Sequence, residues 1–407
     1  MFNVILQKKH YLCKHNAIYT LIYKEASMAA LYVHIPFCRS RCIYCGFYST
    51  TLTQLAAEYV DAVCTELNML AADPCYRRLL QSVRTVYIGG GTPSQLSPAL
   101  LDRLFGAIAQ VCGPLAPMEV TIECNPDDLT EAYAASLACL PVNRVSMGAQ
   151  TFSDRRLRFL HRRHNARQVG QAVQRLRAAG ISNISIDLMF GFPGETLPEW
   201  ETDISEALAL QVEHISAYSL MTEPGTPLSR MISEGEVKEI DEELSLSMYQ
   251  SLIDRLTAAG YEHYEISNFA RPGRQSRHNS SYWDGTPYLG LGAAAHSYDV
   301  DTRWWNVSDV RQYISRITSG ERPVEEREQL SPATRYDDAV VTALRTRRGL
   351  SIHEVEERFG SSMKDYLMAN AQPHLQAGLL TVADGRLRLT RRGLFVSDSV
   401  MADLMFV

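Results

Sequence analysis

The fold of this chain is indicated by residues 31–47, LYVHIPFCRSRCIYCGF, where a short β-rich segment runs into a loop that carries three cysteines. The first five residues include aromatic and β-branched side chains among apolar ones, which is typical of a buried strand. Cys38, Cys42 and Cys45 follow at C-x3-C-x2-C spacing. A strand that ends in a reactive loop is typical of α/β folds whose functional residues lie at the carboxyl ends of the strands.

Strand-like segments recur along the chain, and each is followed by a loop and then by a segment with helical spacing of apolar residues. The six expected strands are residues 31–35, 83–88, 118–122, 143–147, 183–189 and 213–219. The expected helices include residues 56–70, 98–111, 129–138, 166–179, 198–210 and 242–258. Six strand–helix units predict a parallel sheet covered by helices.

Polar and glycine residues follow the ends of these strands. Gly89–Thr92 follows the second strand, Glu123 the third and Gln150 the fourth, while Asp187 lies near the end of the fifth. A barrel gathers such residues from many strands at one face, whereas a doubly wound sheet concentrates them at one switch point. We therefore expect an α/β fold with a partial (β/α)6 barrel of the TIM type.

The C-terminal part of the chain has a different pattern. Helical spacing at 339–344, 352–359 and 363–379 precedes two short β patterns joined by a turn at Ala383-Asp384-Gly385. Helices followed by a hairpin resemble a small winged-helix-like α+β domain. The expected divisions are an N-terminal extension at 1–27, outside a natural start at Met28, a partial barrel at 28–265, a connecting region at 266–325 and a small C-terminal domain at 326–407.

The composition of the 407 residues, 46% hydrophobic and 21% charged, excludes a disordered or fibrous chain. The net charge of −6 argues against binding of nucleic acid by bulk electrostatics. We interpret the basic run near the C-terminus as a solvated face or a partner surface rather than a nucleic-acid site; its members are Arg386, Arg388, Arg391 and Arg392.

No apolar run reaches the roughly 20 residues that a membrane-spanning helix needs, which leaves only peripheral membrane association open. All nine cysteines lie within the first 139 residues of the chain, and their number is odd. Because no secretory signal precedes them, we expect a reducing compartment, the cytoplasm, and a cysteine loop that binds metal rather than forming disulfides.

Three thiolates on one loop select zinc or an iron–sulfur cluster. Structural zinc commonly recruits two separated pairs of ligands, and the sequence has no second Cys-x-x-Cys or His pair. A [4Fe-4S] cluster held by Cys38, Cys42 and Cys45, with one iron left open, is therefore the favoured interpretation.

This C-x3-C-x2-C loop after the first barrel strand resembles the radical S-adenosylmethionine superfamily. The resemblance implies that the open iron binds the amino and carboxylate groups of S-adenosylmethionine, and that reduction cleaves the sulfonium to methionine and a 5′-deoxyadenosyl radical. It also implies a set of cofactor contacts: Tyr32, Gly90, Gly91, Thr92, Glu123, Gln150, Arg162 and Asp187, with Tyr44, Cys45 and Gly46 beside the cluster.

Within that superfamily, the segments YVHIPFC, GGGTPS, GAQTF, HRRH and DLMFGFPGET resemble oxygen-independent coproporphyrinogen III dehydrogenases and HemW-type haem chaperones. The dehydrogenase pattern continues to a fourth cysteine, C-x3-C-x2-C-x-C, where this chain has Phe47. Residues 278–283, HNSSYW, match the H-N-x-x-Y-W motif of the HemW type. Both features favour the chaperone branch.

The HemW resemblance implies a protein that binds haem and delivers it to haem-accepting proteins, with an electron donor for the cluster. The alternative is an oxidoreductase of porphyrin biosynthesis that decarboxylates coproporphyrinogen III to protoporphyrinogen IX. A third hypothesis is an interaction protein with a vestigial cluster. The sequence assigns no catalytic residue and leaves open whether the chain is an enzyme.

His278 is the candidate haem ligand, because a neutral imidazole ligates haem iron and the neighbouring Tyr282 and Trp283 could stack on a porphyrin. An equal alternative is that these residues pack the barrel against the small domain. The other residues that could contact haem are His34, His296 and Cys124.

Overall fold

The computed structural model describes residues 28–406, so the extension expected at 1–27 lies outside the described residues. Six parallel strands follow one another in the order of the sequence, which confirms the predicted strand–helix alternation. They are β1 (Ala29–Ile35), β2 (Val83–Gly90), β3 (Glu119–Cys124), β4 (Arg144–Gln150), β5 (Ile184–Phe190) and β6 (His214–Ser219).

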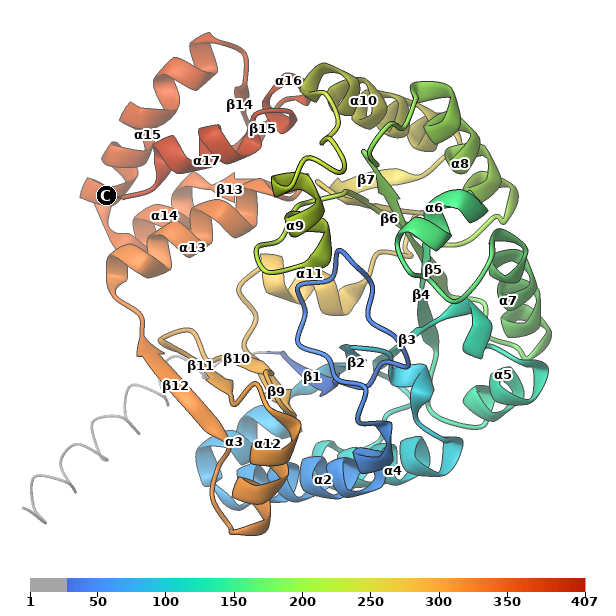
Figure 1. The fold of residues 1–407 in the computed structure, drawn as a ribbon. Helices are drawn as coiled ribbons and strands as arrows, with labels where there is room; N and C mark the ends of the chain where they lie inside the picture. The colour runs from blue at the N-terminus through green and yellow to red at the C-terminus, as the bar shows by residue number, and fades with distance from the viewer. Residues whose placement is uncertain (1–27, 407) are drawn as a thin grey trace, which may run out of the picture.

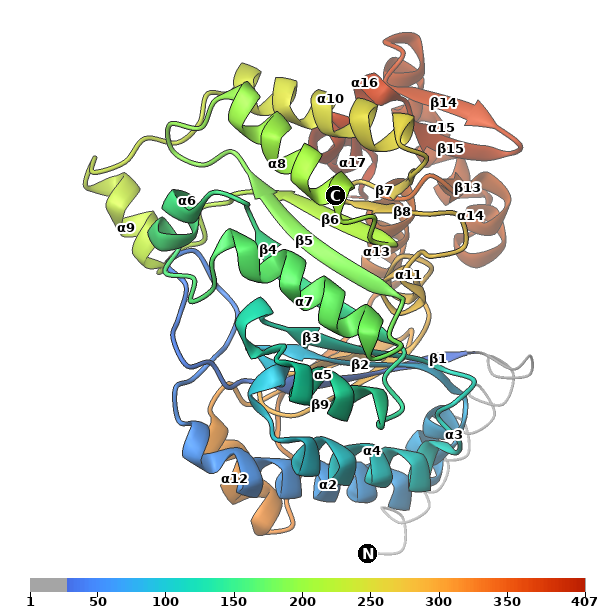
Figure 2. The ribbon, with the colours of Figure 1, turned by 90° about the vertical axis from the view of Figure 1, so that its right-hand side faces the viewer.

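Helices cover the outer face of this curved sheet (Figures 1 and 2). The main helix after each barrel strand is, in order, α2 (Ala56–Ala72), α4 (Pro98–Cys112), α5 (Glu131–Ala138), α7 (Ala166–Ala178), α8 (Leu197–Ala209) and α10 (Glu242–Ala258). Additional helices are α3 (Pro74–Gln81), α6 (Asp154–Phe159) and α9 (Pro227–Ser233), with 3-10 turns η1 (Thr53–Leu55), η2 (Pro93–Gln95) and η3 (Pro126–Asp128). Capping boxes at Asn165 and Thr196 satisfy backbone N–H groups where α7 and α8 begin.

The sheet extends beyond the barrel strands on both sides to twelve strands. On the β1 side lie β9 (Tyr288–Leu291), β10 (His296–Tyr298), β11 (Thr302–Asn306) and β12 (Val324–Gln329), with α11 (Arg277–Trp283) and α12 (Val310–Thr318) between them in the chain. On the β6 side lie β8 (Asn268–Ala270) and β7 (Glu262–Glu265). The segment 266–325, expected to connect two domains, therefore contributes strands to the main sheet.

The two edges of the sheet differ. The edge strand β7 is covered by main chain of residues 345–347: Arg347 N donates to Tyr264 O at 3.0 Å, and Ile266 N, just beyond β7, donates to Arg345 O at 3.0 Å. The opposite edge strand, β12, has the sequence VEEREQ, and its last five residues are exposed. The sheet is therefore open, with one covered edge and one charged edge.

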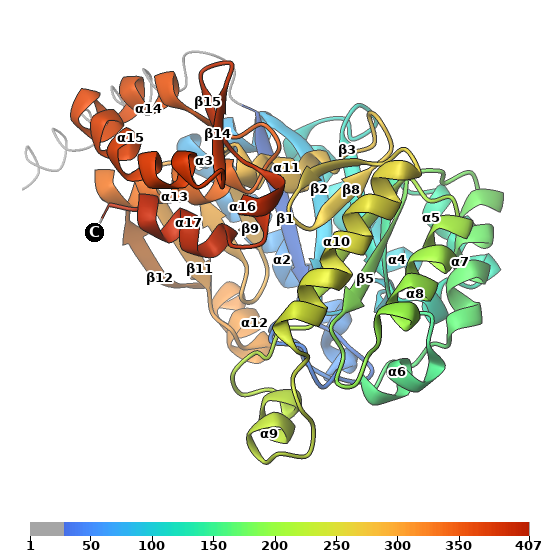
Figure 3. The same ribbon diagram turned by 90° about the horizontal axis from the view of Figure 1, so that it is seen from above.

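A second, smaller hydrophobic core lies in the C-terminal part, between Tyr336 and Leu404. Its elements lie beside β7 (Figure 2) and beside β9, β11 and β12 (Figure 3). They are α13 (Pro332–Leu344), β13 (Leu350–Ser351), α14 (Ile352–Phe359), α15 (Ser361–Gln376), β14 (Leu380–Ala383), β15 (Arg386–Leu389), α16 (Arg391–Leu394) and α17 (Ser397–Leu404). Asp384 and Gly385 join β14 to β15 with φ of 52° and 70°, which confirms the predicted hairpin.

Candidate functional site

The cysteine loop leaves β1 and is closed at its base by main-chain hydrogen bonds. Cys38 N donates to Thr50 O at 2.9 Å, and Thr50 N donates to Pro36 O at 2.7 Å. The Phe37 ring is buried and meets the Tyr59 ring edge-on at 5.3 Å. These contacts fix both ends of the loop against the barrel.

The three thiols are free and half-buried. Burial raises the pKa of Cys38 and of Cys45, and the nearby Cys42 raises both further, so the three sulfur atoms interact. Within residues 28–406, no group of three or more His, Cys, Asp or Glu side chains is spaced to hold a metal ion. Cluster binding requires the thiols to release their protons.

The glycines after β2 allow a close approach of the chain to itself. Gly90 has φ of 114°, and a Cβ there would lie 2.7 Å from Cε1 of His34. A Cβ at Gly91 would lie 2.8 Å from the carbonyl carbon of Pro36. The hydroxyl of Thr92, the next residue, lies 3.4 Å from Cys38 Sγ. These glycines seat the end of β2 against the start of the cysteine loop.

Glu123 and two tyrosines lie beside this glycine turn. The carboxylate of Glu123 accepts hydrogen bonds from Tyr87 OH at 2.8 Å and from Gly90 N at 3.0 Å. Burial, with a smaller contribution from Asp187, raises the pKa of Glu123 to about 7, although the hydrogen bonds from Tyr87 and Gly90 oppose this shift. The ring of Tyr32 stacks on Tyr87 with a centroid distance of 6.2 Å. Glu123 can thus accept hydrogen bonds from a ligand and is poised to titrate near neutrality.

Arg162 links the third and fourth strand ends to the cysteine loop. Its Nη2 atom donates to Asn125 Oδ1 at 2.5 Å and to Gly148 O at 2.7 Å, and its Nη1 atom lies 3.6 Å from Cys42 Sγ. Its Nε atom is buried without a hydrogen-bond partner. A buried donor without an acceptor is costly, so this guanidinium fits a site that receives an anionic ligand.

The ends of β4 and β5 place Gln150 and Asp187 at the same rim. Gln150 is buried and has φ of 68°, next to a register shift between β4 and β5. Asp187 accepts a hydrogen bond from Ser146 Oγ at 3.4 Å, and burial raises its pKa. A glutamine held in the left-handed region is strained, as residues at ligand sites often are.

The remaining predicted neighbours of the cluster contact other loops at this rim. Tyr44 packs with Leu160, Met189 and Phe192 in a small apolar cluster. Gly46 lies against the loop after β6, because a Cβ there would be 3.3 Å from the Cβ of Glu223. The barrel therefore brings together the predicted cofactor contacts at one end.

The residues present fit the cofactors that the sequence implies. Three thiols on one loop supply the ligands of a [4Fe-4S] cluster with one open iron. The unpaired Nε of Arg162 and the carboxyl groups of Glu123 and Asp187 supply the charges that an amino acid and a nucleoside require.

His278 is fully buried, and its ring lies 5.0 Å from the ring of Tyr87, the residue that donates to Glu123. Its Nδ1 lies 2.9 Å from Thr85 Oγ1, and its Nε2 lies 2.9 Å from Tyr282 OH. Its backbone N donates to Glu119 Oε1 at 2.8 Å. Burial lowers the pKa of His278 to about 3, and Arg144 lowers it further. With both ring nitrogens partnered and no exposed surface, the structure favours the packing interpretation of this residue over haem ligation.

The other haem candidates differ in exposure. His34 and Cys124 are buried, and the two ring nitrogens of His34 lie 3.0 Å from Tyr32 OH and Tyr48 O. His296 is exposed on β10, where its ring stacks on Trp305 with a centroid distance of 5.5 Å. Of these imidazoles, that of His296 is the accessible one.

Two site residues are not predicted by the sequence analysis. Asn125, which orients Arg162, follows Glu123 in the IECNP segment and could have been found by its place after a strand. Arg144 is 1% exposed, and its Nε and Nη1 atoms have no hydrogen-bond partner. A charged residue that opens the otherwise apolar β4 was the available signal for Arg144.

Residues 28–406 contain no helix long and apolar enough to cross a membrane. Comparison with known proteins matches residues 32–207 to the radical SAM superfamily and residues 330–396 to the HemN C-terminal domain. The structure resembles that of coproporphyrinogen III oxidase (HemN) from Escherichia coli, a radical SAM enzyme, with a TM-score of 0.82 and 22% identity, over 96% of this chain and 93% of that one. This likeness establishes the fold.

Closer relatives in sequence are proteins named heme chaperone HemW. The one from Bacillus subtilis (strain 168) is 35% identical, over 92% of this chain and 98% of its own length. The one from Lactococcus lactis subsp. lactis (strain IL1403) is 34% identical, over 91% of this chain and 95% of its own length. The chain therefore belongs to the HemW family of the radical SAM superfamily.

Proposed function

We propose that this protein is a cytoplasmic haem chaperone of the HemW type, which binds a [4Fe-4S] cluster, S-adenosylmethionine and haem, and delivers haem to acceptor haemoproteins. The observation that carries the proposal is the 35% identity to a heme chaperone HemW over 98% of that protein. Phe47, 70% exposed, supports it, because the dehydrogenase pattern has a fourth cysteine at this position.

In this proposal the cluster, when bound, supplies the electron that cleaves the sulfonium of S-adenosylmethionine. Cys38, Cys42 and Cys45 hold the cluster as thiolates. Arg162 offers its unpaired Nε to the carboxylate of the cofactor, and Asn125 fixes the guanidinium in place. Glu123 accepts hydrogen bonds from hydroxyl groups and exchanges a proton near neutral pH.

Two assays on the reconstituted full chain separate the proposal from its alternatives. The first loads the protein with haemin, adds an apo-haemoprotein, and follows the Soret band of the acceptor. The second adds S-adenosylmethionine, a reductant and coproporphyrinogen III, and quantifies 5′-deoxyadenosine and protoporphyrinogen IX. Protein with Cys42→Ser is the cluster-deficient control for both assays.

We expect haemin to reach the acceptor, and no multiple-turnover formation of protoporphyrinogen IX. Repeated turnover of coproporphyrinogen III without haem transfer would establish the dehydrogenase alternative instead. Failure of the chain to bind either a cluster or haemin would indicate an interaction protein with a vestigial cysteine loop.

A further inference from the structure

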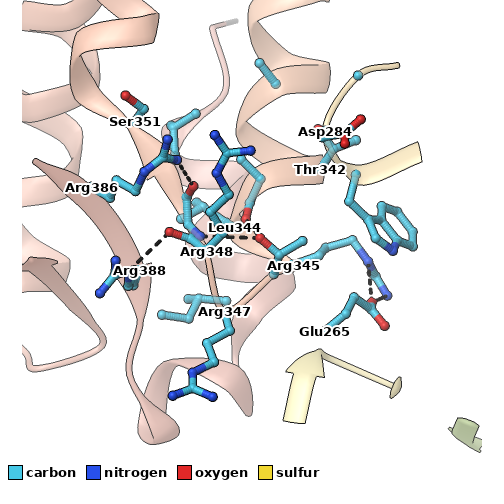
Figure 4. Close-up of a pocket in the computed structure, with 18 of the residues that line it drawn as sticks. Glu265, Asp284, Thr342, Leu344, Arg345, Arg347, Arg348, Ser351, Arg386 and Arg388 are labelled. Atoms are coloured by element: carbon cyan, nitrogen blue, oxygen red, sulfur yellow. Dashed lines mark hydrogen bonds and ion pairs between the residues drawn. The ribbon is translucent and has the colours of Figure 1, made fainter. Parts of the chain in front are cut away.

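A large cleft lies between the barrel and the C-terminal domain. Its volume is about 1260 Å³, above the roughly 300–1,000 Å³ of typical small-molecule sites. One wall comes from β7, the end of α11, β9 and β10, and the other from α13, β13, α14 and β15. Figure 4 shows Glu265 and Asp284 on one side, and Arg386 and Arg388 on the other. None of the cysteines in residues 28–406, and none of the predicted S-adenosylmethionine contacts, lines it.

The two walls are held in a fixed relation at one end of the cleft. Arg345 donates two hydrogen bonds to Glu265 Oε1, from Nε at 3.1 Å and from Nη2 at 2.8 Å. Its guanidinium also lies 4.9 Å from the ring centroid of Trp283. Together with the main-chain bonds between β7 and residues 345–347, these contacts make the cleft a preformed site.

The barrel wall presents aromatic surface. Tyr282 and Tyr288 meet edge-on with ring centroids 4.9 Å apart, and Tyr288 lies 5.9 Å from Tyr298. Trp283, at the end of α11, has a buried Nε1 with no hydrogen-bond partner. Such a wall suits a flat aromatic ligand that carries hydrogen-bond acceptors.

The lining of the cleft carries excess positive charge. Nine lining residues are arginines, and four are acidic. Those acidic residues are partly neutralised already, since Arg345 pairs with Glu265, and Arg386 with Glu354. Among the described residues, Arg347 and Arg358 have no carboxylate within ion-pair distance. Uncompensated guanidinium groups in a recess favour a ligand with carboxylate or phosphate groups.

We propose that this cleft binds a planar aromatic dicarboxylate of the haem class, with its ring against the tyrosine and tryptophan wall and its carboxylates on the arginines of the C-terminal wall. This inference rests on the proposed function and locates its cargo site. It places Tyr282 and Trp283 of the HNSSYW motif in the cleft wall. His278 then positions Tyr282, because His278 Nε2 lies 2.9 Å from the Tyr282 hydroxyl.

The test compares the full chain with Arg347→Gln/Arg358→Gln, which removes two charges and breaks no ion pair. The matched control is Arg167→Gln/Arg311→Gln, since both of these arginines are exposed and lie outside the cleft. Haemin affinity is measured by Soret titration, with haemin dimethyl ester as a probe that lacks carboxylates. We expect the cleft variant to bind haemin at least about tenfold more weakly, equal to ~1.4 kcal/mol.

The control variant should bind haemin with an affinity within about twofold of the parent. The cleft variant should likewise bind the dimethyl ester within about twofold of the parent, and S-adenosylmethionine should not compete with haemin. If the parent chain binds no haemin, the proposed function fails. If the parent binds haemin and the cleft variant binds it equally well, the function stands and the cleft is the wrong site. Stronger binding of a single-stranded oligonucleotide than of haemin, lost in the same variant, would overturn the ligand class.

Discussion

Arg162 reaches the cysteine loop because residue 148 has no side chain. A Cβ at Gly148 would lie 3.0 Å from Nη2 of Arg162 and 2.6 Å from Nε2 of Gln150. The glycine therefore sets the position of two predicted cofactor contacts at once. A substitution at this position tests their role without removing a polar group.

Gly148→Ala should displace the Arg162 guanidinium and weaken S-adenosylmethionine binding about tenfold, or ~1.4 kcal/mol. Equilibrium dialysis of the reconstituted protein measures this. Gly106→Ala in α4 is the matched control, because a Cβ there meets nothing within 4 Å. That control should bind the cofactor normally and gain about 0.5–1 kcal/mol of stability. Equal cofactor affinity in the two variants would contradict the role of Arg162.

Cys42→Ser should abolish the iron–sulfur absorbance after anaerobic reconstitution, because a hydroxyl is a poor ligand for iron in such clusters. Cys139→Ser, at an exposed free thiol outside the loop, should keep the full iron and sulfide content. Iron and sulfide analysis of both proteins checks this. Retention of a complete cluster in Cys42→Ser would show that the ligand set is misassigned.

Glu123 should make stability fall as pH rises. Its pKa is raised to about 7 in the folded chain from 4.5, so its contribution is complete below pH 4.5 and is lost as pH rises through 7. In Glu123→Gln this loss is absent, so the stability of the parent relative to the variant should decline by about 3 kcal/mol between pH 4.5 and 8. Urea unfolding at several pH values measures the difference, and parallel pH profiles would contradict it.

His278→Ala should lower the free energy of unfolding by about 2–4 kcal/mol, because it leaves a cavity and removes the partners of Thr85 and Tyr282. His296→Ala, at an exposed position, should change it by less than about 0.5 kcal/mol. Chemical denaturation compares the two. A His278→Ala protein of normal stability that loses the haemin Soret band would instead identify this imidazole as a ligand.

The barrel strands are predictable because each contains β-branched or aromatic residues and is followed by a loop and a segment with helical spacing of apolar residues. The hairpin of the C-terminal domain is predictable from Asp384-Gly385, whose residue types tolerate positive φ. The cysteine loop is predictable from the C-x3-C-x2-C spacing of its cysteines alone. These features are encoded within a few neighbouring residues.

The outer strands and the environment of His278 depend on partners remote in sequence. β12 has no apolar pattern and exists because it pairs with β11. Thr85, which contacts His278, is 193 residues away from it in the chain. The cleft likewise requires α13 and β13 to be placed against α11, which no local pattern indicates.

The charged edge strand β12 affects whether copies of the protein aggregate. An open sheet exposes N–H and C=O groups that can pair with a strand of another molecule. Among residues 28–406, the main chain of residues 345–347 occupies the β7 edge, whereas no strand pairs with the outer edge of β12. The four charged side chains of VEEREQ disfavour pairing of the β12 edge with a strand of a second copy. They therefore protect the chain from edge-to-edge aggregation.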